Sequence, residues 1–92
     1  MDKYEAKLAV DLNAICVSGG IRYYAYGMEY INPIDKPAYE SIILHDLRAN
    51  SITHADRERT TVEDWKAPPE YVEKRLALLR KANGEGEKRH DA

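Results

Sequence analysis

A chain of 92 residues with 43% apolar residues is long enough for one domain with a hydrophobic core, but a domain this small seldom also encloses a deep substrate cavity. Charged residues make up 33% of the chain, yet the formal net charge is only −2, which argues against broad electrostatic binding to nucleic acid or anionic lipid. The single cysteine, Cys16, excludes an intrachain disulfide and a multi-cysteine metal site.

The N-terminal residues are charged, and no run approaches the roughly 18 apolar residues that a membrane span needs. One cysteine without a partner is also typical of a reducing compartment. We therefore expect a soluble, cytoplasmic protein with no visible export signal.

The first predicted element is a helix over residues 3–17. Tyr4, Leu8, Leu12 and Ile15 recur at helical spacing, and acidic residues near the start suit the helix dipole. The Ser18-Gly19-Gly20 segment is predicted to end this helix, because glycine readily adopts the left-handed conformation of a helix cap.

A tyrosine-rich segment follows over residues 21–31. Four tyrosines fall within eight residues here: Tyr23, Tyr24, Tyr26 and Tyr30. As a helix, the segment would turn Tyr23, Tyr26 and Tyr30 outward. As a strand pair, it would place Tyr24 and Tyr26 on one face with Arg22 and Met28. The sequence leaves both alternatives open, with the aromatic content and flanking glycines favouring strands.

Two more helices are predicted, over residues 36–49 and 69–82. The first follows Asp35 as N-cap and carries Tyr39, Ile42, Ile43 and Leu47 at helical spacing. The second begins at Pro69 and has an apolar stripe that includes Val72, Leu76 and Leu79.

The polar stretch between these helices is predicted to be a loop or a short hairpin that pairs residues 51–54 with 59–62. Residues 61–64 are then predicted to start a further helical turn in the manner of a capping box. The buried core is predicted to contain Leu8, Leu12, Ile15, Ile42, Ile43, Leu47, Val72, Leu76 and Leu79.

Together these elements predict an α+β fold with about three helices and a short β-hairpin, with an all-α bundle of three to four helices as the alternative. Residues 1–84 form the predicted single compact domain. Residues 85–92 lack apolar side chains apart from the last alanine and are predicted to be a flexible C-terminal tail.

The most tempting catalytic signal is the pair His45-Asp46, with His54 and Asp56 downstream. Consecutive residues on a helix point about 100° apart, so His45 and Asp46 would not face one site. No nucleophile has a visible base and orienting group either. We therefore expect no enzyme activity, no catalytic residue, no metal and no cofactor.

Tyrosine and arginine are enriched where proteins contact one another, which favours a binding role. The candidate binding residues are Arg22, Tyr23, Tyr26 and Tyr30, with Arg57 and Arg59 from the charged loop over residues 54–59. The predicted function is a non-enzymatic protein-binding module. Small accessory proteins of phages and mobile elements often inhibit a host nucleic-acid machine, such as a CRISPR effector or a restriction enzyme, and this is the role we expect from that base rate.

Two alternatives remain open. The first is a small nucleic-acid-binding protein that contacts phosphates through Arg57, Arg59 and the basic residues of the last helix, Lys74, Arg75, Arg80 and Lys81. The second is a homodimer in which the apolar stripe of the last helix contacts a second copy of the chain.

Overall fold

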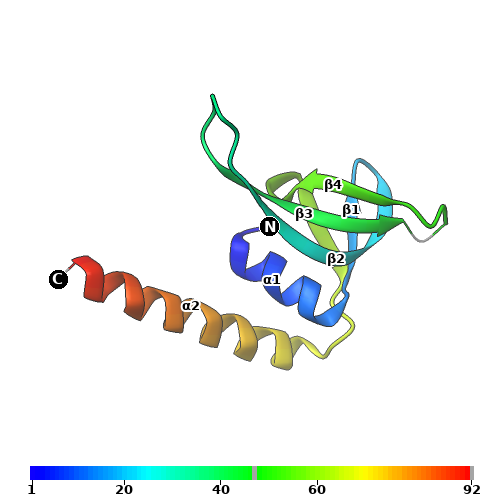
Figure 1. Cartoon of the computed structure of the whole chain (residues 1–92). Helices are drawn as coiled ribbons and strands as arrows, with labels where there is room; N and C mark the ends of the chain where they lie inside the picture. The colour runs from blue at the N-terminus through cyan, green and yellow to red at the C-terminus, as the bar shows by residue number, and fades with distance from the viewer. Residues whose placement is uncertain (47, 92) are drawn as a thin grey trace.

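The computed structural model describes residues 1–46 and 48–91, with side chains described through residue 82. Within these described residues there are two helices, five strands and one 3₁₀ turn, arranged as Figure 1 shows. In chain order these are α1 (Lys3–Leu12), β1 (Ile15–Ser18), β2 (Ile21–Ile31), β3 (Tyr39–Asp46), β4 (Ile52–Asp56), η1 (Arg57–Arg59), β5 (Thr60–Asp64) and α2 (Pro69–Asp91).

The five strands form one antiparallel sheet in the order β4-β3-β2-β1-β5. Strands β4 and β5 are therefore the two edges of the sheet, although only the three residues of η1 separate them in sequence. Such a short connection requires the sheet to curl until its two edges approach each other. The ammonium group of Met1 lies at this corner and donates to the backbone oxygens of Arg57 at 2.7 Å and Thr60 at 2.9 Å.

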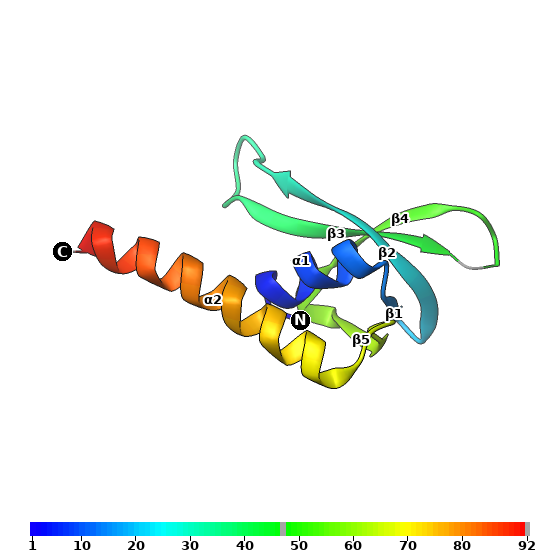
Figure 2. The same cartoon turned by 90° about the horizontal axis from the view of Figure 1, so that it is seen from below.

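Helix α1 lies between the sheet and α2 (Figures 1 and 2). Its contact face consists of small or medium side chains that pack closely on one face of the sheet. The buried cluster between α1 and the sheet contains Ala6, Ala9, Ala14, Cys16, Ala25, Ile42 and Leu44. Of the predicted core residues, Leu8, Ile42 and Val72 are buried, whereas Leu12, Ile15, Ile43, Leu76 and Leu79 are half-buried. Leu47 lies outside the described residues.

The α+β class agrees with the structure, but the prediction of three helices and a short hairpin is wrong. The helix predicted over 3–17 ends at Leu12, because Asn13 adopts the left-handed conformation with φ 50° and its amide closes the last turn. The chain then forms β1, and Gly19 and Gly20 make the β1–β2 turn at φ 58° and 77°.

The helix predicted over 36–49 is instead strand β3. Ile42 and Leu44 both point into the buried cluster, which is the two-residue alternation of a strand. The spacing of Tyr39, Ile42 and Ile43 also fits a helix, so the apolar pattern alone misled the prediction. Pairing with β2 on one side and β4 on the other decides in favour of the strand.

Two predictions for the middle of the chain are also corrected. The segments 51–54 and 59–62 do not pair with each other, because β4 pairs with β3 and β5 pairs with β1. Residues 61–64 belong to β5 and do not begin a helix. The tyrosine-rich segment is β2, so its helical alternative and the all-α bundle are both wrong.

Helix α2 begins at Pro69, as the sequence indicates, and continues past the predicted end to Asp91. Its first part packs against α1 (Figure 2). The predicted flexible tail over 85–92 falls on residues whose side chains lie outside the described set, so it stays a prediction.

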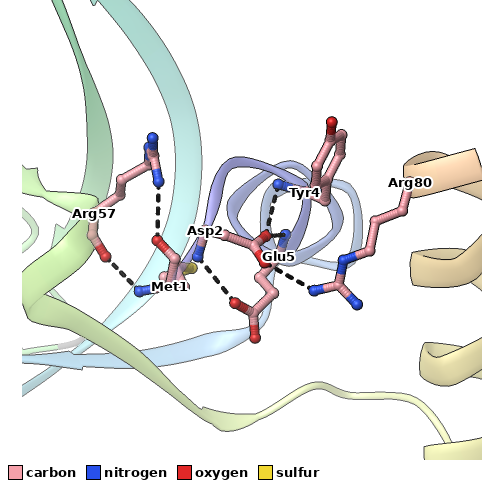
Figure 3. A network of polar contacts seen from close by, with 6 residues as sticks. All are labelled: Met1, Asp2, Tyr4, Glu5, Arg57 and Arg80. Atoms are coloured by element: carbon pink, nitrogen blue, oxygen red, sulfur yellow. Dashed lines mark hydrogen bonds and ion pairs between the residues drawn. The ribbon is translucent and has the colours of Figure 1, made fainter. Parts of the chain in front are cut away.

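Asp2 joins the two helices (Figure 3). Its Oδ1 accepts from the amides of Tyr4 and Glu5, both at 2.9 Å, while Glu5 Oε1 accepts from the Asp2 amide at 2.9 Å, which completes a capping box. Arg80 of α2 donates to Asp2 Oδ2 at 2.8 Å. Burial raises the pKa of Asp2, but the hydrogen bonds from the Glu5 amide and the Arg80 guanidinium outweigh burial, so the pKa lies below its ordinary value of 3.8.

Two replacements of Asp2 separate its cap from its charge. Asp2→Ala will lower the free energy of unfolding by about 1 kcal/mol, because the first amides of α1 lose their acceptor. Asp2→Asn will cost less at pH 7, since asparagine still caps a helix. A carboxyl whose pKa is lowered by folding stabilises the fold above its unfolded pKa and loses that effect as the pH falls. The difference in the free energy of unfolding between the parent and Asp2→Asn will therefore decrease from pH 7 to pH 3, as urea unfolding measures. A difference that does not change with pH would contradict a stabilising charge on Asp2.

Candidate functional site

The strand register places the tyrosines of β2 on two different faces of the sheet. Tyr23 lies opposite Cys16 and packs against the buried cluster, and Ala25 lies opposite Leu44 on the same side. Tyr24 lies between Ile15 of β1 and His45 of β3, so it points away from α1. We call this opposite side the open face, and define it by Ile15, Val17, Arg22, Tyr24, Tyr26, Ile43, His45 and Ile52.

A β-bulge in β2 determines which side chains share the open face. The β2–β3 register shifts between Ala25 and Gly27, which leaves Tyr26 as the extra residue. Tyr26 therefore remains on the face of Tyr24, and its ring centroid lies 6.1 Å from that of His45. Met28 is shifted to the α1 side, opposite Ile42. The predicted strand face is thus right for Arg22, Tyr24 and Tyr26 and wrong for Met28.

The centre of the open face is apolar and accessible. The side chains of Tyr24, Tyr26 and Ile52 are 37%, 57% and 52% exposed. Helix α1 covers the other face of the sheet, and α2 packs on α1 (Figures 1 and 2). An accessible group of rings and branched aliphatic side chains on a sheet is a surface that a partner can cover.

Charged groups surround this apolar centre, mostly in pairs. Arg22 Nε donates to Glu63 Oε2 at 2.8 Å. His54 Nδ1 lies 2.8 Å from Glu29 Oε2, and Lys66 Nζ lies 5.6 Å from the centroid of the Tyr24 ring. The Arg22–Glu63 ion pair carries little net field, so the open face combines an apolar centre with a polar rim.

The predicted binding residues do not form one surface. The structure brings Arg22 and Tyr26 together on the open face, while Tyr23 is half-buried on the α1 side. Tyr30 is 69% exposed but lies on the β2–β3 hairpin where it extends past the rest of the sheet (Figure 1).

The two arginines of η1 are separate again. Arg57 is half-buried and donates from Nη1 to the Met1 oxygen at 3.2 Å, and Arg59 is exposed. The structure adds Tyr24, His45 and Ile52 to the Arg22–Tyr26 surface. Alternation along β2 identifies Tyr24 from sequence, whereas the other two need the register of the sheet.

The histidines and acids considered for catalysis each have a nearby partner in the structure. His45 Nε2 lies 2.9 Å from Asn50 Oδ1, and Asp56 accepts from the Glu58 amide at 3.0 Å. Asp46 accepts from the amides of Arg48 and Ala49, and these hydrogen bonds, the Arg48 bond first, lower its pKa. Among the described residues, no three His, Cys, Asp or Glu side chains gather closely enough to hold a metal ion.

Cys16 lies in the buried cluster with no exposed surface, and burial raises the pKa of its thiol to about 11. The thiolate is the reactive form, and both its population and its access are suppressed here. We expect an aromatic disulfide reagent at pH 8 to modify Cys16 far more slowly in the folded protein than in guanidinium chloride. Equal rates would show that β1 opens readily.

No helix within the part of the chain that the structure describes has the length and apolarity to cross a membrane. Comparison with family models, with curated proteins and with solved structures finds no match for the chain. Its function is therefore inferred from the side chains and their arrangement.

Proposed function

We propose that the chain is a non-enzymatic module that binds a partner protein through the open face. The observation that carries this proposal is the accessible apolar centre around Tyr24 and Tyr26 within a polar rim. Protein interfaces have this arrangement, with aromatic anchors at the centre and polar groups at the edge. Tyrosine suits such a surface, because its hydroxyl tolerates water while its ring is ready to be buried.

The alternative of direct nucleic-acid binding has less support from the geometry. Binding to phosphates needs unpaired basic side chains on one surface. Arg22 is paired with Glu63, and Arg80 is paired with Asp2 on the α1 side. Arg57 and Arg59 belong to η1, at the corner between the sheet edges, and not to the open face.

Affinity capture from the native host tests the proposal with two immobilised proteins, the parent and the double variant Tyr24→Ala/Tyr26→Ala. A partner of the open face is a protein that the parent retains and the double variant does not. Equal capture of the same proteins by both would contradict the proposal. Retention of nucleic acid, with an affinity that falls steeply with salt and is weakened by Arg59→Ala, would favour the alternative instead.

The identity of the captured protein also tests the narrower expectation from sequence. Inhibition of a nucleic-acid machine stays part of the proposal, and it requires that the partner be a nuclease, a restriction enzyme or a CRISPR effector. Purified chain should then reduce the activity of that enzyme at a molar ratio near one, whereas the open-face double variant should not.

A further inference from the structure

A groove of about 670 Å³ lies where the β2–β3 hairpin extends past β4. Tyr30 and Tyr39 line it from the hairpin, and Asp56, Arg57 and Glu58 line it from the end of β4 and from η1. It therefore brings Tyr30 together with Arg57 of η1, and both are candidate binding residues that lie outside the open face. Both rings are accessible, with Tyr30 69% and Tyr39 55% exposed.

The groove runs along a short stretch of unpaired strand edge. The β3–β4 ladder ends at the pair Ser41↔Asp56, because the chain then turns into η1. The Asp46 amide donates to the Ser51 oxygen at 2.8 Å, so the backbone N–H and C=O of Asp46 point toward β4. In an antiparallel strand these groups alternate between the two sides, so every second residue of β3 points the same way. By this alternation the N–H and C=O of Glu40 also point to that side, past the end of β4. Among the described residues no strand continues the ladder there.

Acidic side chains outnumber basic ones in the lining of the groove, with Glu40, Asp56 and Glu58 against Arg57 and His54. Its two basic side chains are engaged within the molecule, Arg57 with the Met1 oxygen and His54 with Glu29. Glu40 and Glu58 also line the groove, and neither forms an ion pair with a residue that the structure describes. Carboxylates beside tyrosine rings favour a cationic side chain, since the face of a ring also attracts a cation.

We propose that this groove binds an extended, positively charged segment of another protein, which continues the line of β4 and pairs with β3 at Glu40. Backbone hydrogen bonds to an exposed strand edge supply the affinity of this mode, and side chains on either face supply the specificity. Here a Lys or Arg side chain lies on the side of Tyr30 and Glu40, which are opposite each other in the β2–β3 ladder, and Glu58 lines the same groove from η1. The inference goes beyond the proposed function, because it concerns a groove that adjoins the open face at His54 and a partner of defined charge.

The probe is an eight-residue peptide of alternating lysine and threonine, titrated into the full chain and followed by amide resonances. We expect the largest shifts at residues 39–41 and 56–58, and exchange of the Glu40 amide with solvent at least about tenfold slower in the complex. A peptide of alternating glutamate and threonine should not bind. The lysine peptide with all its amides N-methylated keeps its charge but lacks donors, and should bind at least about tenfold more weakly.

Matched variants separate the local charges from the net charge of the protein. Glu40→Gln/Glu58→Gln should weaken binding of the lysine peptide by about tenfold, whereas Glu70→Gln/Glu73→Gln on α2, with the same change in net charge, should not. The double variant Tyr24→Ala/Tyr26→Ala should bind the peptide with the affinity of the parent, because both tyrosines lie outside the groove. A failure of peptide binding can therefore be distinguished from a failure of partner binding at the open face.

Three results would overturn the inference: shifts that map elsewhere, equal weakening by both glutamate pairs, or no effect of N-methylation. A fourth would assign the edge to another occupant. If the Glu40 amide is already protected without peptide and the protein sediments as a dimer, a second copy of the chain pairs there and the groove does not serve a basic segment.

Discussion

Replacing Leu44 with alanine will lower the free energy of unfolding by about 2–5 kcal/mol. Leu44 has no exposed surface and lies in the cluster between α1 and the sheet, where close packing leaves little freedom to fill the space. A domain of this size has a total stability of about 5–15 kcal/mol, so the change removes a large part of it. Urea unfolding followed by circular dichroism measures the loss.

The control for this prediction is Leu78→Ala on α2, where the side chain is 57% exposed. The same truncation at this surface position should change the stability by no more than about 0.5 kcal/mol. If Leu44→Ala were as mild as Leu78→Ala, the burial of Leu44 between α1 and the sheet would be wrong. Leu12, another core residue predicted from the sequence, is half-buried in the structure, so Leu44 is the better position for this test.

The second large effect is on binding. Tyr24→Ala with Tyr26→Ala should weaken binding to the partner by roughly a thousandfold, because an interface anchor contributes about 2 kcal/mol or more and the two losses together approach three powers of ten. The fold should persist, since both rings are accessible and neither belongs to the buried cluster. Calorimetric titration of the captured partner gives the ratio of dissociation constants, and the melting temperature confirms that the variant is folded.

The matched control truncates two exposed side chains elsewhere, Tyr71→Ala with Leu78→Ala on α2. This pair should leave the affinity nearly unchanged. The reverse pattern, with loss of binding only in the α2 pair, would move the contact surface to α2, which the sequence also offered as a dimer interface. A sedimentation experiment on the parent and the α2 pair then shows whether that contact joins two copies of the chain.

The sequence predicts where the two helices begin, but it misses the end of α1 at Asn13 and fails where pairing between strands decides. Pro69 begins α2 as predicted, and the start of α1 is close to its predicted position. The segment around Ile42 fits both a helical and an alternating pattern, and only pairing with β2 and β4 selects the strand. Such pairings join residues far apart in sequence, so no local pattern contains them.

The candidate site shows the same division. The density of tyrosines identifies β2 as the informative segment, and alternation places Tyr24 and Tyr26 together. The bulge at Tyr26 then reverses the side on which Met28 lies, an effect that depends on the register with β3. Gly27 is a local sign of it, because glycine within a strand often marks a bulge. The same reversal places Tyr30, two residues after Met28, on the α1 side, so the bulge as well as the length of the hairpin separates Tyr30 from Tyr26.

The pairing of β5 with β1 has a consequence for how the chain emerges during synthesis. Strands β1 to β4 are made in the order in which they pair, so this meander can assemble as it appears. One edge of β1, which includes Ile15, Cys16 and Val17, is covered only when Thr60–Asp64 follows. Any fragment that stops before β5 exposes that short apolar edge to other chains. Early termination or cleavage in η1 will therefore produce a species that aggregates, and not merely a less stable domain.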